Sequence, residues 1–184
     1  MSAPSRAHGY RSPTTRGGIE IKDDSKRWQE INPSEHEHER AGLRHIKLLL
    51  PDTDPYFAWA NVEFVAPDSS INEVDLLVLT PSGLHLVELK HWQGEIVSGD
   101  GMRWRVRSLT GRPRWEDNPL ILANRKAKRL ASLLEHYRNQ SGRNIRVPFI
   151  RPAVFLHAPN LRVNLDEVGR QHVYGLATNP KSGL

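Results

Sequence analysis

The chain has 184 residues, 38% of them hydrophobic, and its 26 basic and 21 acidic side chains give a net charge of +5. This length favours one globular domain with a polar extension over two full domains. The absence of cysteine excludes disulfides, thiolate nucleophiles and cysteine-based zinc sites, and it fits a reducing compartment. No apolar stretch approaches the roughly 20 residues of a membrane span, and no signal peptide is evident, so we expect a cytoplasmic protein without membrane contact.

A polar N-terminal segment precedes the first predicted helix. Residues 1–28, rich in Ser, Arg, Gly and Pro, are predicted to form a flexible basic arm, and residues 29–184 the folded domain, with its core at about 34–159. Ser34 and Glu37 match a capping box and predict a helix from Ser34 to Leu50. On that helix Glu39 shares one face with Leu43, Ile46 and Leu50.

The middle of the chain predicts mainly strands. Apolar, β-branched runs indicate strands at 56–66, 71–80, 84–92, 95–98 and 102–108. The turn Thr80–Gly83 returns the third run antiparallel to the second, and Gly99-Asp100-Gly101 indicates a further hairpin.

The last third predicts one long helix and a late strand. Asn118 is a good cap and Pro119 suits the first helical position, so we expect a helix to about Arg138, with Leu120, Ala123, Ala127, Leu130 and Leu134 facing inward. Further strands are expected at 152–156, 162–165 and 172–176. The predicted fold class is α/β, with a mixed sheet of an antiparallel meander plus a later strand, flanked by helices.

Charge is segregated along the chain. Residues 35–100 carry a balance of −8 and residues 101–151 a balance of +10. Two interpretations stay open: neighbouring faces that neutralise one another, or an acidic metal site beside a basic phosphate track.

Three polar residues interrupt the apolar strands of the acidic segment. Glu88 and Lys90 are two residues apart and project from one face of their strand. A turn closed by Leu79 opposite Leu84 places Asp75 opposite Glu88, whereas a three-residue loop without a bulge turns Asp75 away. A Glu-x-Lys pair alone is more often an exposed ion pair, so the combination with Asp75 carries the hypothesis.

Carboxylates in this arrangement suit a hard divalent cation. Asp75 and Glu88 supply the oxygen ligands that Mg²⁺, or Mn²⁺, takes together with substrate phosphate, and Lys90 would orient water or stabilise negative charge. Glu39 would hold a second ion or a metal-bound water, and Glu73, on the same face as Asp75, is a substitute ligand.

Basic and aromatic residues follow the acidic segment. Arginines alternate with Trp104 and Trp115, a composition suited to nucleic acid, although core packing is the better interpretation for Trp92. The expected phosphate contacts are Arg103, Arg105, Arg125, Lys126, Lys128 and Arg129. His36 and His38 look like a metal pair, but residues two apart on a helix face different ways, so a solvated helix start is the better interpretation.

The spacing of these residues resembles a known family. Asp75, Glu88-x-Lys90, Trp92-x-Gly94-x-Ile96, Trp104 and Asn118-Pro119 are similar to the NERD (nuclease-related) domain of the PD-(D/E)xK restriction-endonuclease-like superfamily. The resemblance extends from about Ser34 to Pro159 and assigns Asp75, Glu88 and Lys90 to the catalytic positions and Glu39 to the first-helix acid. Where many members have Gln after Asn-Pro, this chain has Ala123-Asn124, which makes Asn124 the equivalent and a departure from the pattern.

Two further segments resemble the N-terminal region of PglW-type serine/threonine kinases of phage growth limitation and BREX phage-defence systems. They are Ser34–Arg40 and Asp117–Lys128. The chain has no Gly-rich kinase loop and no His-Arg-Asp loop, so a kinase domain would lie outside it.

The resemblance implies a Mg²⁺-dependent nuclease-like domain that acts on DNA, in the N-terminal part of a larger phage-defence protein. Other proteins of the defence system are expected partners, and a homodimer is one arrangement for cutting both strands. The alternative is a catalytically silent module that binds nucleic acid or docks a partner, since a nuclease fold does not guarantee activity.

Overall fold

The computed structural model describes residues 21, 25–99, 101–109 and 111–176. The expected basic arm, residues 1–28, lies mostly outside these residues, although β1 already begins at Trp28. The elements in chain order are β1 (Trp28–Glu30), α1 (Glu37–Leu49), β2 (Phe57–Val65), β3 (Ile71–Thr80), β4 (Gly83–Lys90), β5 (Glu95–Gly99), β6 (Arg103–Arg107), β7 (Arg114–Asp117), α2 (Pro119–Ser141), β8 (Ile150–Leu156), β9 (Arg162–Val163) and β10 (Val173–Gly175).

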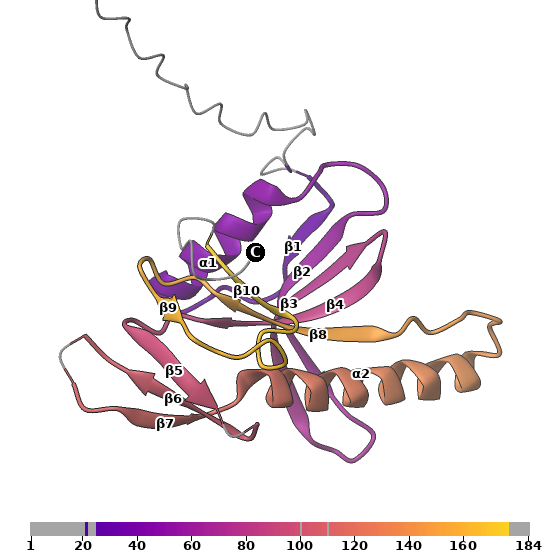
Figure 1. Cartoon of the computed structure of the whole chain (residues 1–184). Helices are drawn as coiled ribbons and strands as arrows, with labels where there is room; N and C mark the ends of the chain where they lie inside the picture. Colours follow the sequence, from indigo (N-terminus) through magenta and orange to yellow (C-terminus); the bar gives the residue numbers. More distant parts are fainter. Residues whose placement is uncertain (1–20, 22–24, 100, 110, 177–184) are drawn as a thin grey trace, which may run out of the picture.

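A six-stranded mixed sheet forms the centre of the domain, in the order β1-β2-β3-β4-β8-β10. β2, β3 and β4 form an antiparallel meander, whereas β8 pairs parallel to β4 and β10 parallel to β8. α1 lies on one face of this sheet and α2 on the other (Figure 1). The structure therefore confirms the predicted α/β class and the meander with a later strand, and it matches a restriction-endonuclease-like core.

The register of β3 against β4 is the one that the sequence predicts. Leu79 pairs with Leu84, and the ladder continues to Leu76 opposite Val87. Thr80 also pairs with Gly83, so the connection is a two-residue turn and not the four-residue loop that the sequence indicated. The extra pair leaves every other residue opposite its expected partner, so the side chains of both strands point to the expected faces.

The start of α1 differs from the prediction. The helix begins at Glu37 with His36 as its N-cap, and no side chain caps it. The capping box is therefore wrong: the Ser34 hydroxyl donates to a Glu39 carboxylate oxygen at 2.8 Å and does not reach a backbone N–H of the first turn in the manner of a cap. The apolar face is as expected, because Leu43 is buried and Ile46 packs on the same cluster.

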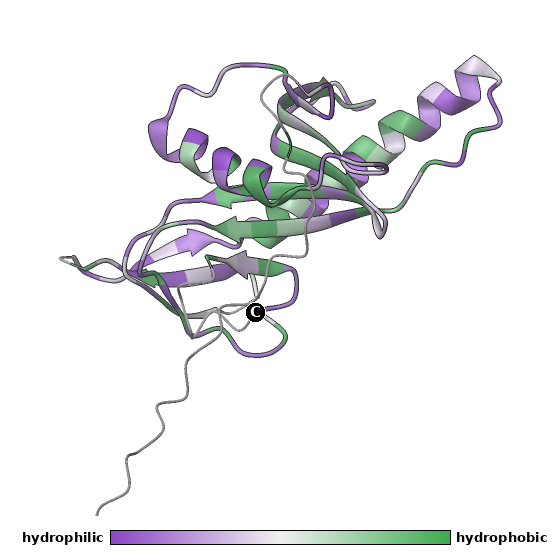
Figure 2. Cartoon of the chain, turned by 90° about the horizontal axis from the view of Figure 1, so that it is seen from above, coloured by the Kyte–Doolittle hydropathy of each residue, from purple (hydrophilic) through white to green (hydrophobic). Residues whose placement is uncertain are grey.

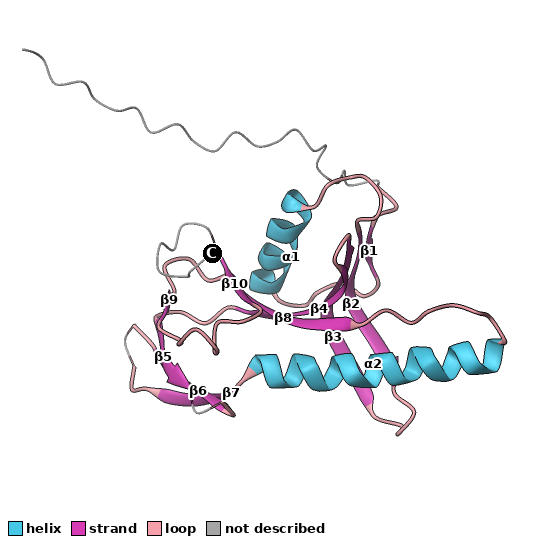
Figure 3. Ribbon diagram, turned by 45° about the vertical axis from the view of Figure 1, so that its right-hand side comes forward, coloured by secondary structure: helices cyan, strands magenta, loops and turns pink. Residues whose placement is uncertain are grey.

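α2 has the predicted cap. The Asn118 side chain accepts a hydrogen bond from the Leu120 backbone N–H at 3.0 Å and donates one to the Gly101 carbonyl at 2.9 Å. Ala123, Ala127 and Leu130 are buried against the sheet. The C-terminal part of the helix extends beyond the strands (Figure 3) and is coloured as hydrophilic, whereas the hydrophobic residues concentrate on the strands and the first part of α2 (Figure 2).

A smaller sheet, in the order β7-β6-β5-β9, packs beside the second half of β8 and the start of β10. Its core includes Trp104, which is fully buried, and Trp92, whose ring meets that of Trp104 edge-on with centroids 6.0 Å apart. The packing role expected for Trp92 is confirmed. Trp115 on β7 is 51% exposed.

Neither described helix combines the length and the apolar composition that a membrane crossing requires.

The cap of α2 is open to a stability test. Replacing Asn118 by Ala removes both of its hydrogen bonds and should lower the free energy of unfolding by about 1–2 kcal/mol. Asn124, exposed in the interior of the same helix, is the matched control, and Asn124→Ala should leave stability unchanged or slightly raised because Ala is the better helix former. Urea unfolding of both variants measures the difference, and equal losses would contradict a capping role for Asn118.

Candidate functional site

Asp75 lies where the ladder between β3 and β4 ends. Beyond Leu76 opposite Val87, the Asp75 Oδ2 atom accepts a hydrogen bond of 2.6 Å from the backbone N–H of Leu89. A side-chain carboxylate thus binds the β4 backbone just past the last ladder pair. The contact fixes Asp75 against β4 and leaves its second oxygen available to other partners.

Glu88 is a nearly buried charge, with 3% of its surface exposed. Its Oε1 atom accepts from Lys126 Nζ on α2 at 2.6 Å, and its Oε2 atom lies 3.6 Å from Lys90 Nζ. The predicted Glu88–Lys90 pair therefore exists. Lys126, which the sequence analysis assigned to phosphate, forms the shortest ion pair of Glu88.

The environment raises the pKa of Asp75 to about 6. Burial is the main cause and the negative charge of Glu88 the second, while the hydrogen bond from Leu89 and the charges of Lys90 and Lys126 act in the opposite direction. Asp75 and Glu88 therefore repel each other, and a cation bound beside both would relieve that repulsion.

A pocket of about 370 Å³ opens beside Asp75, between the start of α1 and strands β2 and β3. Glu39 and Glu73 line it together with Asp75, as the sequence analysis expected of these acids. Glu88 and Lys90 are not in its lining. Asp75 is the residue that joins the carboxylate pair on β3 and β4 to this pocket.

Asn61 adds a further oxygen to the pocket. Asn61 lies on β2 opposite Asp75, because its neighbours Ala60 and Val62 pair with the two residues on either side of Asp75. Its backbone is left-handed, with a φ of 54°. The Asn61 side-chain nitrogen donates to the Asn32 carbonyl at 2.8 Å, but among the residues that the structure describes its buried Oδ1 atom has no hydrogen-bond partner. A buried acceptor of this kind is able to take a cation or a donor from a ligand.

The hairpin also changes its packing at Asn61. Ala60 and Leu76 pack beneath α1, whereas Phe64 and Val74, on the same side of their strands by alternation, pack against α2. The left-handed residue therefore lies where the hairpin passes from α1 to α2, and Asn61 and Asp75 both line the pocket at that point.

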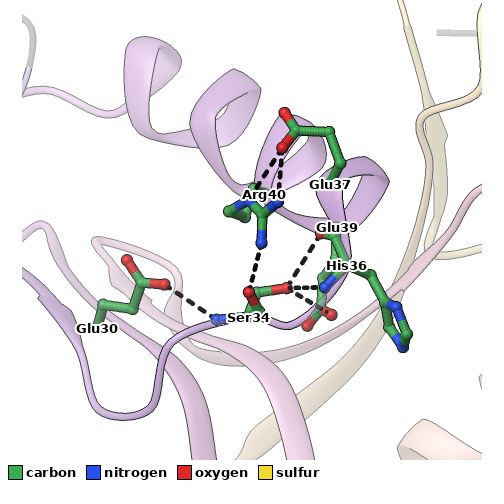
Figure 4. A network of polar contacts seen from close by, with 6 residues as sticks. All are labelled: Glu30, Ser34, His36, Glu37, Glu39 and Arg40. Atoms are coloured by element: carbon green, nitrogen blue, oxygen red, sulfur yellow. Dashed lines mark hydrogen bonds and ion pairs between the residues drawn. The ribbon is translucent and has the colours of Figure 1, made fainter.

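Glu39 is held in place by its own neighbours (Figure 4). Ser34 donates to the Glu39 carboxylate, and the Ser34 carbonyl accepts from Arg40 Nη1 at 2.7 Å. Arg40 is in turn paired with Glu37 at 2.6 Å. One Glu39 oxygen is thus engaged, which orients the carboxylate without saturating it.

The donor set fits a hard divalent cation in chemical type. Asp75, Glu39, Glu73 and the Asn61 amide offer only oxygen atoms, the ligands that Mg²⁺ and Mn²⁺ prefer. Among the described residues, no three His, Asp or Glu side chains already stand around one point as a complete metal group. Glu88 is engaged by two lysines, so a cation bound directly by Glu88 would share its oxygens with them or displace one.

The remaining basic residues lie in two places, α2 and the smaller sheet. On α2, a second pocket of about 400 Å³ is lined by Glu73 with Arg125, Lys126 and Arg129. Lys128 is exposed on the same helix, as is the polar residue Asn124. Arg129 also donates to the Asn72 side chain at 3.1 Å. Arg103 and Arg105 belong to β6 of the smaller sheet, and Arg103 stacks over the Trp115 ring at 5.5 Å.

The structure thus joins Asp75 to Glu88 and Lys90 on one side, and to Glu39 and Glu73 on the other. Sequence reasoning missed Asn61, and it assigned Lys126 to phosphate without its contact with Glu88. Lys126 lies three positions after Ala123 and four before Leu130, on the buried side of α2, and this spacing was the available signal. The only sequence signal for Asn61 is weaker: an Asn, which tolerates left-handed backbone, stands inside an otherwise apolar strand.

The raised pKa of Asp75 predicts a pH-dependent stability in the absence of divalent ions. The folded protein holds the Asp75 proton more tightly than the unfolded chain does. The stabilising contribution of protonated Asp75 to folding is therefore fully present below about pH 4 and is lost as pH rises through about 6. Asp75→Asn keeps an acceptor for Leu89 and carries no charge. The variant should be more stable than the wild type at about pH 8, by up to about 3 kcal/mol, and this gain should vanish at about pH 4.

Urea unfolding in a chelator at both pH values measures this gain. A variant that is less stable than the wild type by the same amount at both would contradict the proposed electrostatic strain at Asp75.

The Lys126–Glu88 pair predicts a loss of stability when the lysine is removed. Lys126→Met keeps the stem but leaves a nearly buried carboxylate with Lys90 alone, and should cost about 1–3 kcal/mol. Lys128→Met, exposed on the same helix, is the control and should change stability by less than about 0.5 kcal/mol. Thermal unfolding compares the two variants, and equal effects would show that the pair does not stabilise the fold.

Comparison with known proteins agrees with this geometry. Residues 34–157, about two thirds of the chain, match the family model described as a nuclease-related domain, NERD. Over 108 residues, 59% of this chain, the sequence is 51% identical to a protein named probable kinase PglW from Streptomyces coelicolor (strain ATCC BAA-471 / A3(2) / M145). The matched region spans only 7% of that relative's length. No solved structure matches. The match over most of the chain, together with Asp75, Glu88 and Lys90 on adjacent strands, shows that this chain belongs to the NERD family.

Proposed function

We propose that this domain hydrolyses DNA phosphodiester bonds with Mg²⁺ or Mn²⁺ at Asp75. The observation that carries the proposal is the position of Asp75, a carboxylate with a raised pKa between the buried Glu88 and an oxygen-lined pocket with an unpaired amide oxygen. Perturbed carboxylates beside a pocket are typical of catalytic sites. The family match supports a nuclease-like domain, and the DNA substrate and the metal are our inference.

Asp75 and Glu88 are the proposed metal-binding residues, with Glu39 and Asn61 completing the oxygen set from the pocket side. A bound divalent ion would polarise a phosphoryl oxygen and favour ionisation of water. The protein prepares this site by holding one Asp75 oxygen on the Leu89 N–H and one Glu39 oxygen on the Ser34 hydroxyl. Glu73, exposed on the same strand, serves as the substitute ligand at the pocket rim.

The two lysines have different proposed roles. Lys126 neutralises Glu88 at 2.6 Å and so holds the carboxylate in place before substrate arrives. Lys90 is the looser partner at 3.6 Å, so it is better able to turn toward a phosphate oxygen or a water. Its ammonium group would then donate hydrogen bonds to the charge that develops on the reacting phosphoryl group.

Basic residues near the pocket suit an incoming phosphate backbone. Arg125 and Arg129 line the neighbouring pocket on α2, and Lys128 is exposed on the same helix. Arg103 and Arg105, on β6 of the smaller sheet, are proposed as further phosphate contacts. These contacts would bind DNA without reading its sequence, because they address phosphate.

A second function has an observation in its favour. Glu88 is already neutralised by two lysines, and among the described residues no complete metal group is formed. Such a site folds without a cation, which suits a module that binds nucleic acid or docks a partner without cutting.

We further propose that residues 29–184 act as one domain of a larger phage-defence protein, with residues 1–28 as a basic arm. The similarity to a probable kinase, of which the chain matches 7%, and the PglW-like segments around Ser34 and Asp117 support this assignment. Other proteins of the defence system are the proposed partners, and a homodimer would present two sites to the two DNA strands.

The cleavage test compares the wild type with Asp75→Asn, Glu88→Gln and Lys90→Ala on plasmid and linear DNA. With Mg²⁺ or Mn²⁺ the wild type should cut, and each variant should lose at least about 100-fold in rate. Binding to DNA at low salt should change little, since phosphate affinity rests on the arginines. Glu135→Gln, a carboxylate paired with Arg138 on α2, is the control and should cut at the wild-type rate.

A wild type that binds DNA but never cuts it would overturn the nuclease proposal and leave the binding module. Failure to bind DNA at low salt would remove both nucleic-acid functions and leave partner docking alone.

A further inference from the structure

A cluster of histidines lies on the opposite face of β4 from the carboxylate site. His91 follows Lys90 at the end of β4, and His157 follows Leu156 at the end of β8, so the two come from adjacent parallel strands. The backbone N–H of His157 donates to the Lys90 carbonyl at 3.2 Å, which extends the pairing to this point. His38 reaches the same place from the first turn of α1, with its ring 5.4 Å from that of His91.

The separation of two ring nitrogens is the informative distance. His91 Nδ1 and His157 Nδ1 are 3.4 Å apart, at the long end of hydrogen-bond distances. Two nitrogens that each lie about 2.05 Å from a tetrahedral Zn²⁺ are themselves about 3.3–3.4 Å apart. The spacing therefore fits two ligands of one ion as well as an N–H···N hydrogen bond.

The packing holds His157 in this position. His157 is 6% exposed and lies against α1, where a Cβ at Gly42 would be 3.0 Å from its ring. Its other side meets Phe155, with ring centroids 5.8 Å apart. Burial and the neighbouring histidines His91, His38 and His45 lower the pKa of His157 to about 4, and burial and His38 lower the pKa of His91. Neutral imidazole is the form that binds metal.

We propose that His38, His91 and His157 form a binding site for a borderline divalent transition metal such as Zn²⁺. The site lies across β4 from Glu88 and does not depend on the proposed nuclease function, although His38 precedes Glu39 on α1 and His36, stacked on His38, lines the Asp75 pocket. In the described part of the chain the three rings do not yet surround one point. His38 is exposed on the first turn of α1, and exposed side chains change rotamer readily, so its rotation supplies the third nitrogen. Water fills the remaining tetrahedral position.

The sequence analysis set the pair His36 and His38 aside because residues two apart on a helix diverge. That reason does not hold for His36, because it is the N-cap with extended backbone, and its ring stacks on that of His38 at 5.3 Å. The expectation of a solvated helix start is nevertheless confirmed, since both side chains are exposed. The ligand set we propose instead draws one histidine from each of three segments.

Co²⁺ is the probe, because a tetrahedral site gives it an intense visible absorption that an octahedral one does not. The untagged full chain should bind one equivalent with the tetrahedral spectrum, and its melting temperature should rise by several degrees with saturating Zn²⁺. His38→Gln and His91→Gln should each weaken Co²⁺ binding at least about tenfold. His136→Gln, on the exposed side of α2 and bonded to Gln140, is the matched control and should bind as the wild type does.

Asp75→Asn combined with Glu88→Gln should leave the Co²⁺ spectrum unchanged. Loss of the spectrum in that double variant would place the ion at the carboxylates and overturn the proposal, as would a wild type with only octahedral Co²⁺ or equal losses in His136→Gln and His91→Gln. Circular dichroism checks folding. If His91→Gln does not fold, the exposed His38→Gln decides the outcome.

Discussion

The burial of the Glu88 carboxylate is the constraint on which the arrangement around the sheet depends. A nearly buried negative charge requires a cation within contact distance, and α2 supplies it through Lys126. The small residues Ala123 and Ala127 on the same side of the helix allow α2 to approach the sheet closely enough for that contact. The inner face of α2 therefore serves both packing and charge compensation, and it fixes which turn of the helix crosses β4.

Much of this fold follows from local sequence signals. The turn at Pro81 and Ser82 sets the register of β3 and β4, and Asn118-Pro119 marks the start of α2. Local signals failed where a segment is short or polar. β1 has three residues and β7 is Arg114–Asp117, and neither shows the apolar alternation by which strands are recognised. The helix start at α1 was misplaced because the Ser34 hydroxyl binds a carboxylate two residues beyond the expected partner.

Some residues of the candidate site could likewise be predicted from local signals and others could not. Asp75, Glu88 and Lys90 could be grouped from the sequence because strand alternation and one turn determine their faces. Lys126 could not be grouped with them, since its partner depends on how α2 lies across the sheet. Asn61 depends on a left-handed backbone, and the histidines at 38, 91 and 157 depend on the meeting of three distant segments. Contacts between elements, unlike those within a hairpin, leave little trace in a single sequence.

The alternation along β4 has a consequence for how this segment can vary. Glu88 and Lys90 face α2, whereas Leu89 packs on the α1 side and His91 lies with the histidines there. Adding or removing one residue before Glu88 would exchange the two sides, so that the acid and the lysine would enter the α1 core and Leu89 would meet Lys126. Individual side chains can be replaced one at a time, but the length of the strand serves both faces at once. Spacing, more than residue identity, is thus the feature that β4 can least afford to lose.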